Sequence, residues 1–405
     1  MNKGACIIGQ SGGPTAVINS SVLGIIEKSL KDNVFSAVYG AINGIAGIME
    51  EEIIDFSNYS LEELQLLKTT PSAILGSVRK KLPDNLQDEA FKKVEEIFIK
   101  YNIRCFFYIG GNDSMDTCLK LSKYFKNSKH KCLVIGIPKT IDNDMLEIDH
   151  TPGYASACKF IYTTLSEIYE DINCYKKGRV TIVEIMGRDS GWLTCASKVA
   201  SYYGQGPDLI YIPEGRFDTN QFLKDVESLY LKKNKVLVAV SEGIRDINGH
   251  YLLQSHINNN ADHFGHIQLG GIGSVLAEIV NKELGLQVRS VELNILQRCA
   301  SHLLSKTDVE EAYNCGSYGV ELYLQGLTGQ MVSMRRKEGK DYEIEYYPVD
   351  LEKIANFVRT VPTEYINEFN NNINDEFLDY ILPLIQGEIN LPFENGFPKY
   401  FKLRK

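Results

Sequence analysis

Two short apolar runs, each followed directly by a polar loop, restrict the fold more than any other feature of this sequence. Residues Cys105–Ile109 precede the loop GGNDS, and residues Cys132–Ile137 precede PKTIDND. Short apolar runs bounded by turn-forming residues predict strands that are buried on both faces, as in a parallel sheet covered by helices. Loops that follow parallel strands lie side by side at the carboxyl edge of the sheet, where ligands bind. We therefore expect this pair of loops to form a reaction centre.

The same pattern of strand and polar loop recurs along the chain. Gly4–Gly9 precedes a Gly-Gly turn and a helical pattern, and Arg179–Ile185 precedes MGRDSGW. Leu209–Ile212 ends before Pro-Glu, and Lys235–Val240 ends before SEG. A chain of 405 residues has enough material for two such units. We predict an α/β protein with two doubly wound domains, each a sheet between two layers of helices.

The domain boundaries and several elements are further expectations. We place one domain in residues 1–144 together with about 299–346, a second in 145–298, and a helical C-terminal extension in 347–405. The patterns also predict a helix over Asp55–Leu67, a helix over Ser301–Tyr313 and a return to sheet at Gly319–Leu324.

Composition excludes several classes of protein. A formal net charge of −9 gives no general electrostatic reason to bind nucleic acid or an anionic membrane. No run of about 18 apolar residues is present, so we expect no membrane span. The nine cysteines lack CxxC pairs, which argues against a zinc or redox site and favours reduced thiols in the cytoplasm. The N-terminus lacks the long apolar region of a signal peptide.

Several loops have both a functional and a structural interpretation. Gly12 and Gly13 join a strand to a helix, an arrangement that suits either anion binding or a plain tight turn. Asp113, at the start of a predicted helix, is either a ligand or a helix cap. The cluster of Arg79, Lys80 and Lys81 could reach a phosphate, although a solvated surface run is the simpler interpretation of the lysines.

The loop after the second apolar run favours chemistry over a structural turn. Lys139 precedes Asp142 and Asp144, and a cation beside two carboxylates suits phosphoryl transfer. The cation neutralises the transferred group, one carboxylate accepts a proton, and acidic oxygens hold Mg²⁺. Arg188 could hold the same group through its planar set of donors. The alternatives are a surface turn of Asp and Asn residues and a structural salt bridge for Arg188.

These segments together resemble one enzyme family. SGGPTAVIN, IGGNDS, PKTIDND, GRVTIVEIMGRDSGWL, IPEG, SEG and LQR occur in the order and spacing typical of phosphofructokinases, over roughly Ala5 to Val320. The presence of TIDND and MGR in one chain is highly specific. The tail beyond about Tyr347 lies outside the shared core, and the resemblance implies nothing for it.

The resemblance implies roles for the residues of the sugar site. Asp142 matches the base that takes the proton from the sugar 1-hydroxyl, and Arg188 matches the arginine that steadies the transferred phosphoryl group. Glu242 matches a carboxylate that binds sugar hydroxyls. Other matching positions for the sugar are Thr140, Ile141, Met186 and Gly187.

A further group of residues matches the 6-phosphate site. Arg298 of the LQR motif, with Ile295 and Gln297, would grip the 6-phosphate. Arg179 and Arg289 complete this group and are typically contributed by a neighbouring subunit. The resemblance therefore implies a homo-oligomer whose active site is shared between subunits.

Two positions indicate the phosphoryl donor. Family members that use ATP have small residues where this chain has Asp113 and Lys139. Asp113 would crowd and repel the α-phosphate region of ATP, whereas Lys139 supplies charge for a donor without a nucleotide. This combination is similar to pyrophosphate-dependent phosphofructokinases. It implies reversible transfer from pyrophosphate to the 1-hydroxyl of fructose 6-phosphate, with the donor at Gly12, Gly13, Arg79, Gly111, Asp113 and Lys139 and with Mg²⁺ near Asn112 and Asp113.

Two alternatives to this function remain open at this point. One is an ATP-dependent phosphofructokinase, and the other is a non-catalytic, sugar-phosphate-binding regulatory subunit. Asn112 stands where the family has a metal-associated aspartate, and Asn294 and Ile295 replace a glycine and a more polar residue. The segment FGHIQLGG resembles a second 6-phosphate motif, but Leu269 replaces its arginine, so we favour NILQR for that site.

Overall fold

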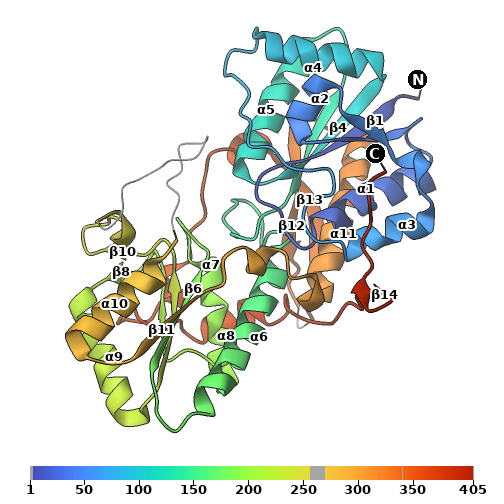
Figure 1. Ribbon diagram of the computed structural model, residues 1–405. Helices are drawn as coiled ribbons and strands as arrows, with labels where there is room; N and C mark the ends of the chain where they lie inside the picture. Colours follow the sequence, from blue (N-terminus) through green and yellow to red (C-terminus); the bar gives the residue numbers. More distant parts are fainter. Residues whose placement is uncertain (1–2, 256–269, 340, 405) are drawn as a thin grey trace.

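The computed structural model describes residues 3–255, 270–339 and 341–404. These residues form two α/β lobes, each built around its own sheet, with helices packed on both faces (Figure 1). The predicted fold class of two α/β units is therefore confirmed. The FGHIQLGG segment falls outside the described residues as far as Leu269.

The first lobe contains a seven-stranded sheet with the strand order β13-β12-β5-β4-β1-β2-β3. Its inner strands are parallel, and β3 and β13 are antiparallel to their neighbours at the two edges. The strands are β1 (Ala5–Gln10), β2 (Val38–Ala41), β3 (Ile53–Asp55), β4 (Ile103–Gly110), β5 (Leu133–Pro138), β12 (Gln330–Arg336) and β13 (Ile344–Asp350). Its helices are α1 (Ile18–Lys31), α2 (Gly44–Glu50), α3 (Leu61–Gln65), α4 (Glu89–Lys100), α5 (Asn112–Asn127) and α11 (Lys306–Leu324).

The second lobe contains a four-stranded parallel sheet with the order β11-β6-β9-β7. Its strands are β6 (Val180–Ile185), β7 (Leu209–Tyr211), β9 (Val236–Ser241) and β11 (Val288–Glu292), with a small pair formed by β8 (Arg216–Phe217) and β10 (Arg245–Asp246). Its helices are α6 (Tyr154–Asn173), α7 (Trp192–Cys195), α8 (Ser197–Tyr202), α9 (Thr219–Lys233) and α10 (Ile272–Leu284).

The predicted strand at Gly319–Leu324 is wrong, because these residues are the last part of α11. The helix predicted over Ser301–Tyr313 begins at Lys306 and continues to Leu324. Aromatic and β-branched residues favoured a strand, but α11 packs directly on α1. A Cβ atom added at Gly316 would lie 2.0 Å from the carbonyl oxygen of Ser21. This close helix contact outweighs local propensity.

The helix predicted over Asp55–Leu67 is also much shorter than expected. Asp55 ends β3, and only Leu61–Gln65 is α-helical. The helix starts at a capping box in which Ser60 and Glu63 bond to each other's backbone N–H groups. This cap fixes the start at Ser60 and leaves the preceding residues in a turn.

The segment that follows β13 is less helical than predicted. It contains one short helix, α12 (Glu376–Ile381), and a small hairpin formed by β14 (Phe393–Glu394) and β15 (Phe397–Pro398). Asparagine side chains compete with helical hydrogen bonds here, since Asn367 Oδ1 accepts from the backbone N–H groups of residues 371 and 372.

The extension also connects the two lobes. It leaves β13, crosses to the second lobe and returns to the first, where Arg404 contacts Glu63 of α3 (Figure 1). Asn371 Nδ2 donates to Asp225 on α9, and the backbone N–H of Phe401 donates to Thr70 of the first lobe. Within the ranges described, no helix has both the length and the apolar character needed to cross a bilayer.

Candidate active site

A cleft of about 790 Å³ lies where the carboxyl ends of the two sheets face each other. Its walls come from the loops that directly follow β1, β4, β5, β6 and β9, as expected for loops at the carboxyl edge of parallel strands. Most of the predicted site residues line it. They are Gly12, Gly13, Arg79, Gly111, Asn112, Asp113, Lys139, Thr140, Ile141, Asp142, Met186, Gly187, Arg188, Glu242, Ile295 and Arg298.

Three predicted residues do not line this cleft. Gln297 is buried beside it, and neither atom of its side-chain amide has a hydrogen-bond partner. Arg179 and Arg289 line a separate cavity of about 250 Å³ near the amino ends of β6 and β11. Arg179 directly precedes β6, a six-residue strand that spans roughly 20 Å, and Arg289 pairs with Thr181 near the start of β6, so both lie toward the amino edge of their sheet.

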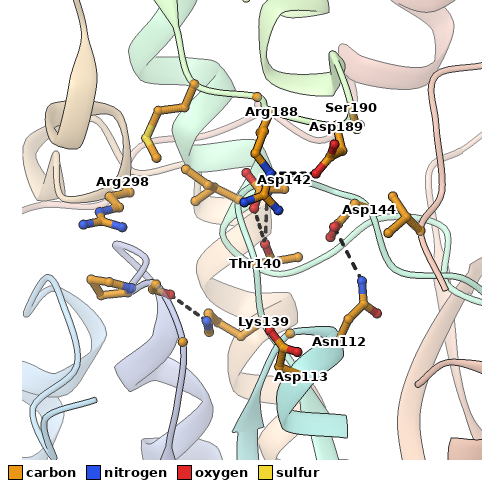
Figure 2. A pocket seen from close by; sticks show the side chains of 18 of the residues that line it. Asn112, Asp113, Lys139, Thr140, Asp142, Asp144, Arg188, Asp189, Ser190 and Arg298 are labelled. Carbon is orange, nitrogen blue, oxygen red and sulfur yellow. Dashed lines mark hydrogen bonds and ion pairs between the residues drawn. The ribbon is translucent and has the colours of Figure 1, made fainter. Parts of the chain in front are cut away.

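Lys139 lines the cleft beside the glycine loop after β1. Its side chain is buried, and its Nζ donates to the carbonyl oxygen of Gly13 at 2.6 Å (Figure 2). Gly12 adopts a φ of +76°, a conformation that favours glycine, and its carbonyl oxygen accepts from Ser77 Oγ. Burial lowers the pKa of Lys139 to about 8, so the amine is still mainly protonated at neutral pH.

Asp142 and Asp144 lie on one turn after β5. The backbone N–H of Asp142 donates to Thr140 Oγ1 at 3.1 Å. The Thr140 hydroxyl in turn donates to the Asp142 carboxylate at 3.3 Å. Removal from bulk water raises the pKa of Asp142. The same effect and the nearby charge of Asp142 raise the pKa of Asp144 to about 7. A carboxylate with a raised pKa is a better proton acceptor, which suits a general base.

Arg188 reaches the same part of the cleft from the second lobe (Figure 2). Its Nε donates to Asp189 at 2.7 Å, and Asp189 also accepts from Arg245 and from the Tyr251 hydroxyl. Asp189 therefore fixes one edge of the guanidinium of Arg188. The ion pair with Asp189, which outweighs the opposing effect of burial, raises the pKa of Arg188.

Glu242 follows β9 and lines the part of the cleft formed by the second lobe. Its carboxylate accepts from the backbone N–H of Gly187 at 3.2 Å. Burial raises the pKa of Glu242 to about 7. A partly protonated carboxyl can both donate to and accept from a hydroxyl, which suits polyol recognition.

One pair of residues has oxygens suited to a divalent cation. Asn112 Oδ1 is buried without a hydrogen-bond partner, and Asn112 Nδ2 lies 3.5 Å from Asp144 Oδ2. Mg²⁺ is commonly held by one or two protein oxygens together with phosphate oxygens and water. Among the described residues no group of three or more His, Cys, Asp or Glu side chains forms a self-contained metal site. Asp113, the other predicted ligand, pairs with Lys81 at 3.3 Å.

Several residues of the cleft were not predicted from the sequence. Lys81 lines it, although a solvated surface run was the simpler interpretation. Asp189 could have been found from its position next to Arg188. Asn356, Phe357 and Val358 come from the C-terminal extension, to which the resemblance assigned nothing, and no motif pointed to them.

Comparisons with known proteins agree with this arrangement. The family model described as phosphofructokinase matches residues 5–301. A protein of Halomonas elongata named pyrophosphate--fructose 6-phosphate 1-phosphotransferase is 39% identical, and the match covers 98% of this chain and 95% of that protein. A protein of the same name from Methylococcus capsulatus is 36% identical over 97% of this chain and 94% of its own length.

A solved structure is similar over the whole chain. The crystal structure of pyrophosphate-dependent phosphofructokinase from Nitrosospira multiformis has a TM-score of 0.89 and 34% identity, with 98% of this chain and 96% of that chain covered. The resemblance seen in the motifs is therefore confirmed, and the match extends through the C-terminal extension. The chain belongs to the phosphofructokinase family.

Proposed function

We propose that this protein transfers a phosphoryl group from inorganic pyrophosphate to the 1-hydroxyl of fructose 6-phosphate, giving fructose 1,6-bisphosphate and phosphate. The observation that carries the proposal is the buried Lys139 at the donor end of the cleft, opposite Asp142. The names of relatives that align over nearly the whole chain support it. Pyrophosphate and a sugar phosphate differ little in transfer potential, so the reaction runs readily in both directions.

In this proposal Asp142 is the general base and Arg188 stabilises the transferred group. Asp142 removes the proton from the sugar 1-hydroxyl as the hydroxyl oxygen attacks the donor phosphorus. The bond from that phosphorus to the bridging oxygen of pyrophosphate breaks at the same time. Arg188 faces the same point from the other lobe, held there by Asp189. Its two terminal nitrogens are suited to paired hydrogen bonds with phosphoryl oxygens.

Lys139, Arg79 and the glycine loop bind the pyrophosphate. Lys139 and Arg79 supply positive charge, and the backbone of Gly12, Gly13 and Gly111 allows close approach of the phosphates. Asp113, paired with Lys81, stands at the place where a longer nucleotide donor would pass. The carboxylate would repel the phosphate chain of ATP, which favours the short donor.

Asn112 and Asp144 would hold Mg²⁺ together with the donor. The two residues lie on adjacent loops, and a half-turn of the Asn112 amide would bring Oδ1, which has no protein partner, to the side that now faces Asp144. The ion supplies charge neutralisation at the phosphoryl oxygens. Asp113 is the second predicted ligand, but its ion pair with Lys81 makes Asp144 the stronger candidate.

The sugar phosphate binds on the side of the second lobe. Thr140, Ile141, Met186, Gly187 and Glu242 surround the sugar, and Arg298 with the 294–298 turn takes the 6-phosphate. Arg179 and Arg289 lie near the opposite edge of their own sheet, so they complete the 6-phosphate site of a neighbouring copy. The enzyme is thus a homo-oligomer with a shared active site, and we place it in the cytoplasm, consistent with nine cysteines that form no disulfide.

A donor comparison tests the proposal. Formation of fructose 1,6-bisphosphate is measured at fixed fructose 6-phosphate and Mg²⁺, with either pyrophosphate or ATP as donor. Turnover with pyrophosphate and little or none with ATP is expected. Turnover with ATP alone would instead establish the ATP-dependent alternative, and turnover with neither would leave the regulatory alternative.

A double substitution separates the two donors within the chain. Replacing Asp113 and Lys139 by glycine should abolish the use of pyrophosphate, because the positive charge of Lys139 is lost together with the steric restriction that Asp113 imposes at the donor end. If ATP were the natural donor, the same double variant would retain its activity.

A further inference from the structure

The turn that carries both catalytic-loop aspartates is held by the C-terminal extension. Asn143 lies between Asp142 and Asp144 and has a φ of +54°, so the backbone reverses sharply there. Its buried side-chain amide donates to the Tyr380 hydroxyl at 2.8 Å and accepts from the backbone N–H of Thr151 at 3.0 Å. Tyr380 belongs to α12, far beyond the residues matched by the family model.

Arg359 makes the larger contribution to this turn. Its Nε and Nη2 both donate to the carbonyl oxygen of Asn143, at 3.1 and 2.9 Å. Its Nη1 donates to the carbonyl oxygens of Ile148 and Asp149, at 2.7 and 2.8 Å. The backbone N–H of Arg359 donates to the carbonyl oxygen of Asp144 at 2.7 Å. One side chain therefore fixes both ends of the loop that carries the aspartates.

Arg359 is itself fixed by Trp192, which belongs to the second lobe. Its guanidinium lies 4.7 Å from the centre of the indole ring, and Trp192 Nε1 donates to the carbonyl oxygen of Arg359 at 3.3 Å. A planar guanidinium can stack on an indole and donate in its own plane at once, which an ammonium cannot do.

The extension also reaches the loop that follows Arg188. The backbone N–H of Val361 donates to Glu214 Oε1 at 2.8 Å, and the same carboxylate accepts from the N–H of Gly191 at 3.0 Å. Gly191 lies three residues after Arg188. Residues 359–361 thus join the Asp142 turn to the Arg188 loop, which belong to different lobes.

From these contacts the structure assigns Arg359 a function as a positioning residue for the transfer reaction. It keeps the Asp142–Asp144 turn at a fixed distance and orientation from the loop of Arg188. This inference rests on the proposed functions of Asp142 and Arg188. Small displacements of reacting groups cost large factors in rate, so the loss of Arg359 should act on turnover and leave sugar-phosphate binding largely intact.

Arg359→Lys tests the assignment, and Arg404→Lys is its matched control. Arg404 also stacks on an aromatic ring, that of Tyr59, and donates to a backbone carbonyl, that of Asn58, but neither partner lines the cleft. We expect kcat of Arg359→Lys to fall about 100-fold, with KM for fructose 6-phosphate changed less than about threefold. The control should keep kcat within about threefold of the unsubstituted enzyme.

Trp192 is the only tryptophan in the chain, so the tryptophan fluorescence of the protein reports directly on the contact with Arg359. The fluorescence emission should change in folded Arg359→Lys and remain nearly unchanged in Arg404→Lys. If Arg359→Lys does not fold, Trp192→Phe replaces it as the test. That variant removes the bond to the Arg359 carbonyl and weakens the stacking, and its kcat should fall about tenfold.

Two results would overturn the assignment: turnover that survives in the tested Arg359 or Trp192 variant, or an equal loss of turnover in Arg404→Lys. Asp142→Asn, assayed in parallel, keeps the two proposals apart. An inactive Asp142→Asn beside a fully active Arg359→Lys would refute only the positioning function. An active Asp142→Asn would refute the assigned base.

Discussion

The ammonium of Lys139 lies 2.6 Å from the carbonyl oxygen of Gly13, so the loop after β5 is attached to the glycine loop after β1. This contact places a buried cation at the proposed donor end of the cleft. The same nitrogen can bond a phosphate oxygen while it keeps the carbonyl, because an ammonium has three donors. The position of Lys139 is therefore set before the donor arrives.

Lys139→Met should remove the use of pyrophosphate and preserve the fold. Methionine fills similar space without a buried charge, whose desolvation is costly, so the melting temperature should not fall substantially. We expect kcat/KM for pyrophosphate to drop about 1,000-fold, a range typical for loss of a fixed charge at the transferred group. Fructose 6-phosphate binding, measured by calorimetry, should be retained, and unchanged kcat/KM would contradict the assigned role.

The lowered pKa of Lys139 predicts the pH dependence of donor use. Burial brings this pKa to about 8, so the amine is charged below that pH and neutral above it. Because the cation binds the donor, kcat/KM for pyrophosphate should fall about tenfold per pH unit above pH 8. A pH profile between 6 and 10 measures this, with Lys139→Arg as the control that should stay charged throughout. A profile that remains flat to pH 10 would be incompatible with a cationic function of Lys139.

The sequence predicted the parts of this enzyme that depend on local patterns. Apolar runs that end in glycine and carboxylate loops identified the strands, and the loops after β1, β4, β5, β6 and β9 meet in one cleft. The motifs located this cleft because each proposed catalytic group lies within a few residues of a strand end.

Contacts between distant segments could not be predicted in this way. The strand expected at Gly319–Leu324 is the end of a helix that packs closely on α1 through Gly316, a contact that no local pattern shows. Arg359 bonds to Asn143 across more than two hundred residues of sequence. Such pairs follow from the path of the extension over both lobes, and no residue near Arg359 forms a motif.

Asp142→Asn tests the base directly. The amide has nearly the same shape but cannot accept the proton at neutral pH, so kcat should fall by a factor of about 100 to 10,000. The KM for fructose 6-phosphate should change little, since binding does not need the proton transfer. Single-turnover measurement of fructose 1,6-bisphosphate formation provides the readout. Full activity would show that another group is the base.

His150 predicts how stability depends on pH. It is buried between Asp149 and Glu311, at 2.8 and 2.6 Å, and these two carboxylates outweigh the effect of burial and raise its pKa to about 9. A folded-state pKa above the unfolded value of about 6.5 means that the stabilisation is complete below pH 6.5 and is lost as the pH rises through 9. The loss should reach about 3 kcal/mol in the free energy of unfolding.

His150→Gln isolates this contribution of the imidazole. The melting temperature of the unsubstituted protein should fall more steeply between pH 6.5 and 9 than that of the variant. Equal slopes for the two proteins would mean that His150 is neutral in the folded state across this range.

Asp189→Asn should reduce turnover through Arg188, which it contacts at 2.7 Å. The amide keeps one acceptor but loses the charge that holds Arg188, Arg245 and the Tyr251 hydroxyl, so Arg188 can turn away from the transferred group. We expect kcat to fall about 10- to 100-fold. Asp225→Asn is the matched control, because Asp225 also accepts from a tyrosine and two amides in the same lobe but does not line the cleft. Comparable melting temperatures with a loss of kcat only in Asp189→Asn would assign the effect to Arg188, whereas equal losses of kcat would assign it to the lobe as a whole.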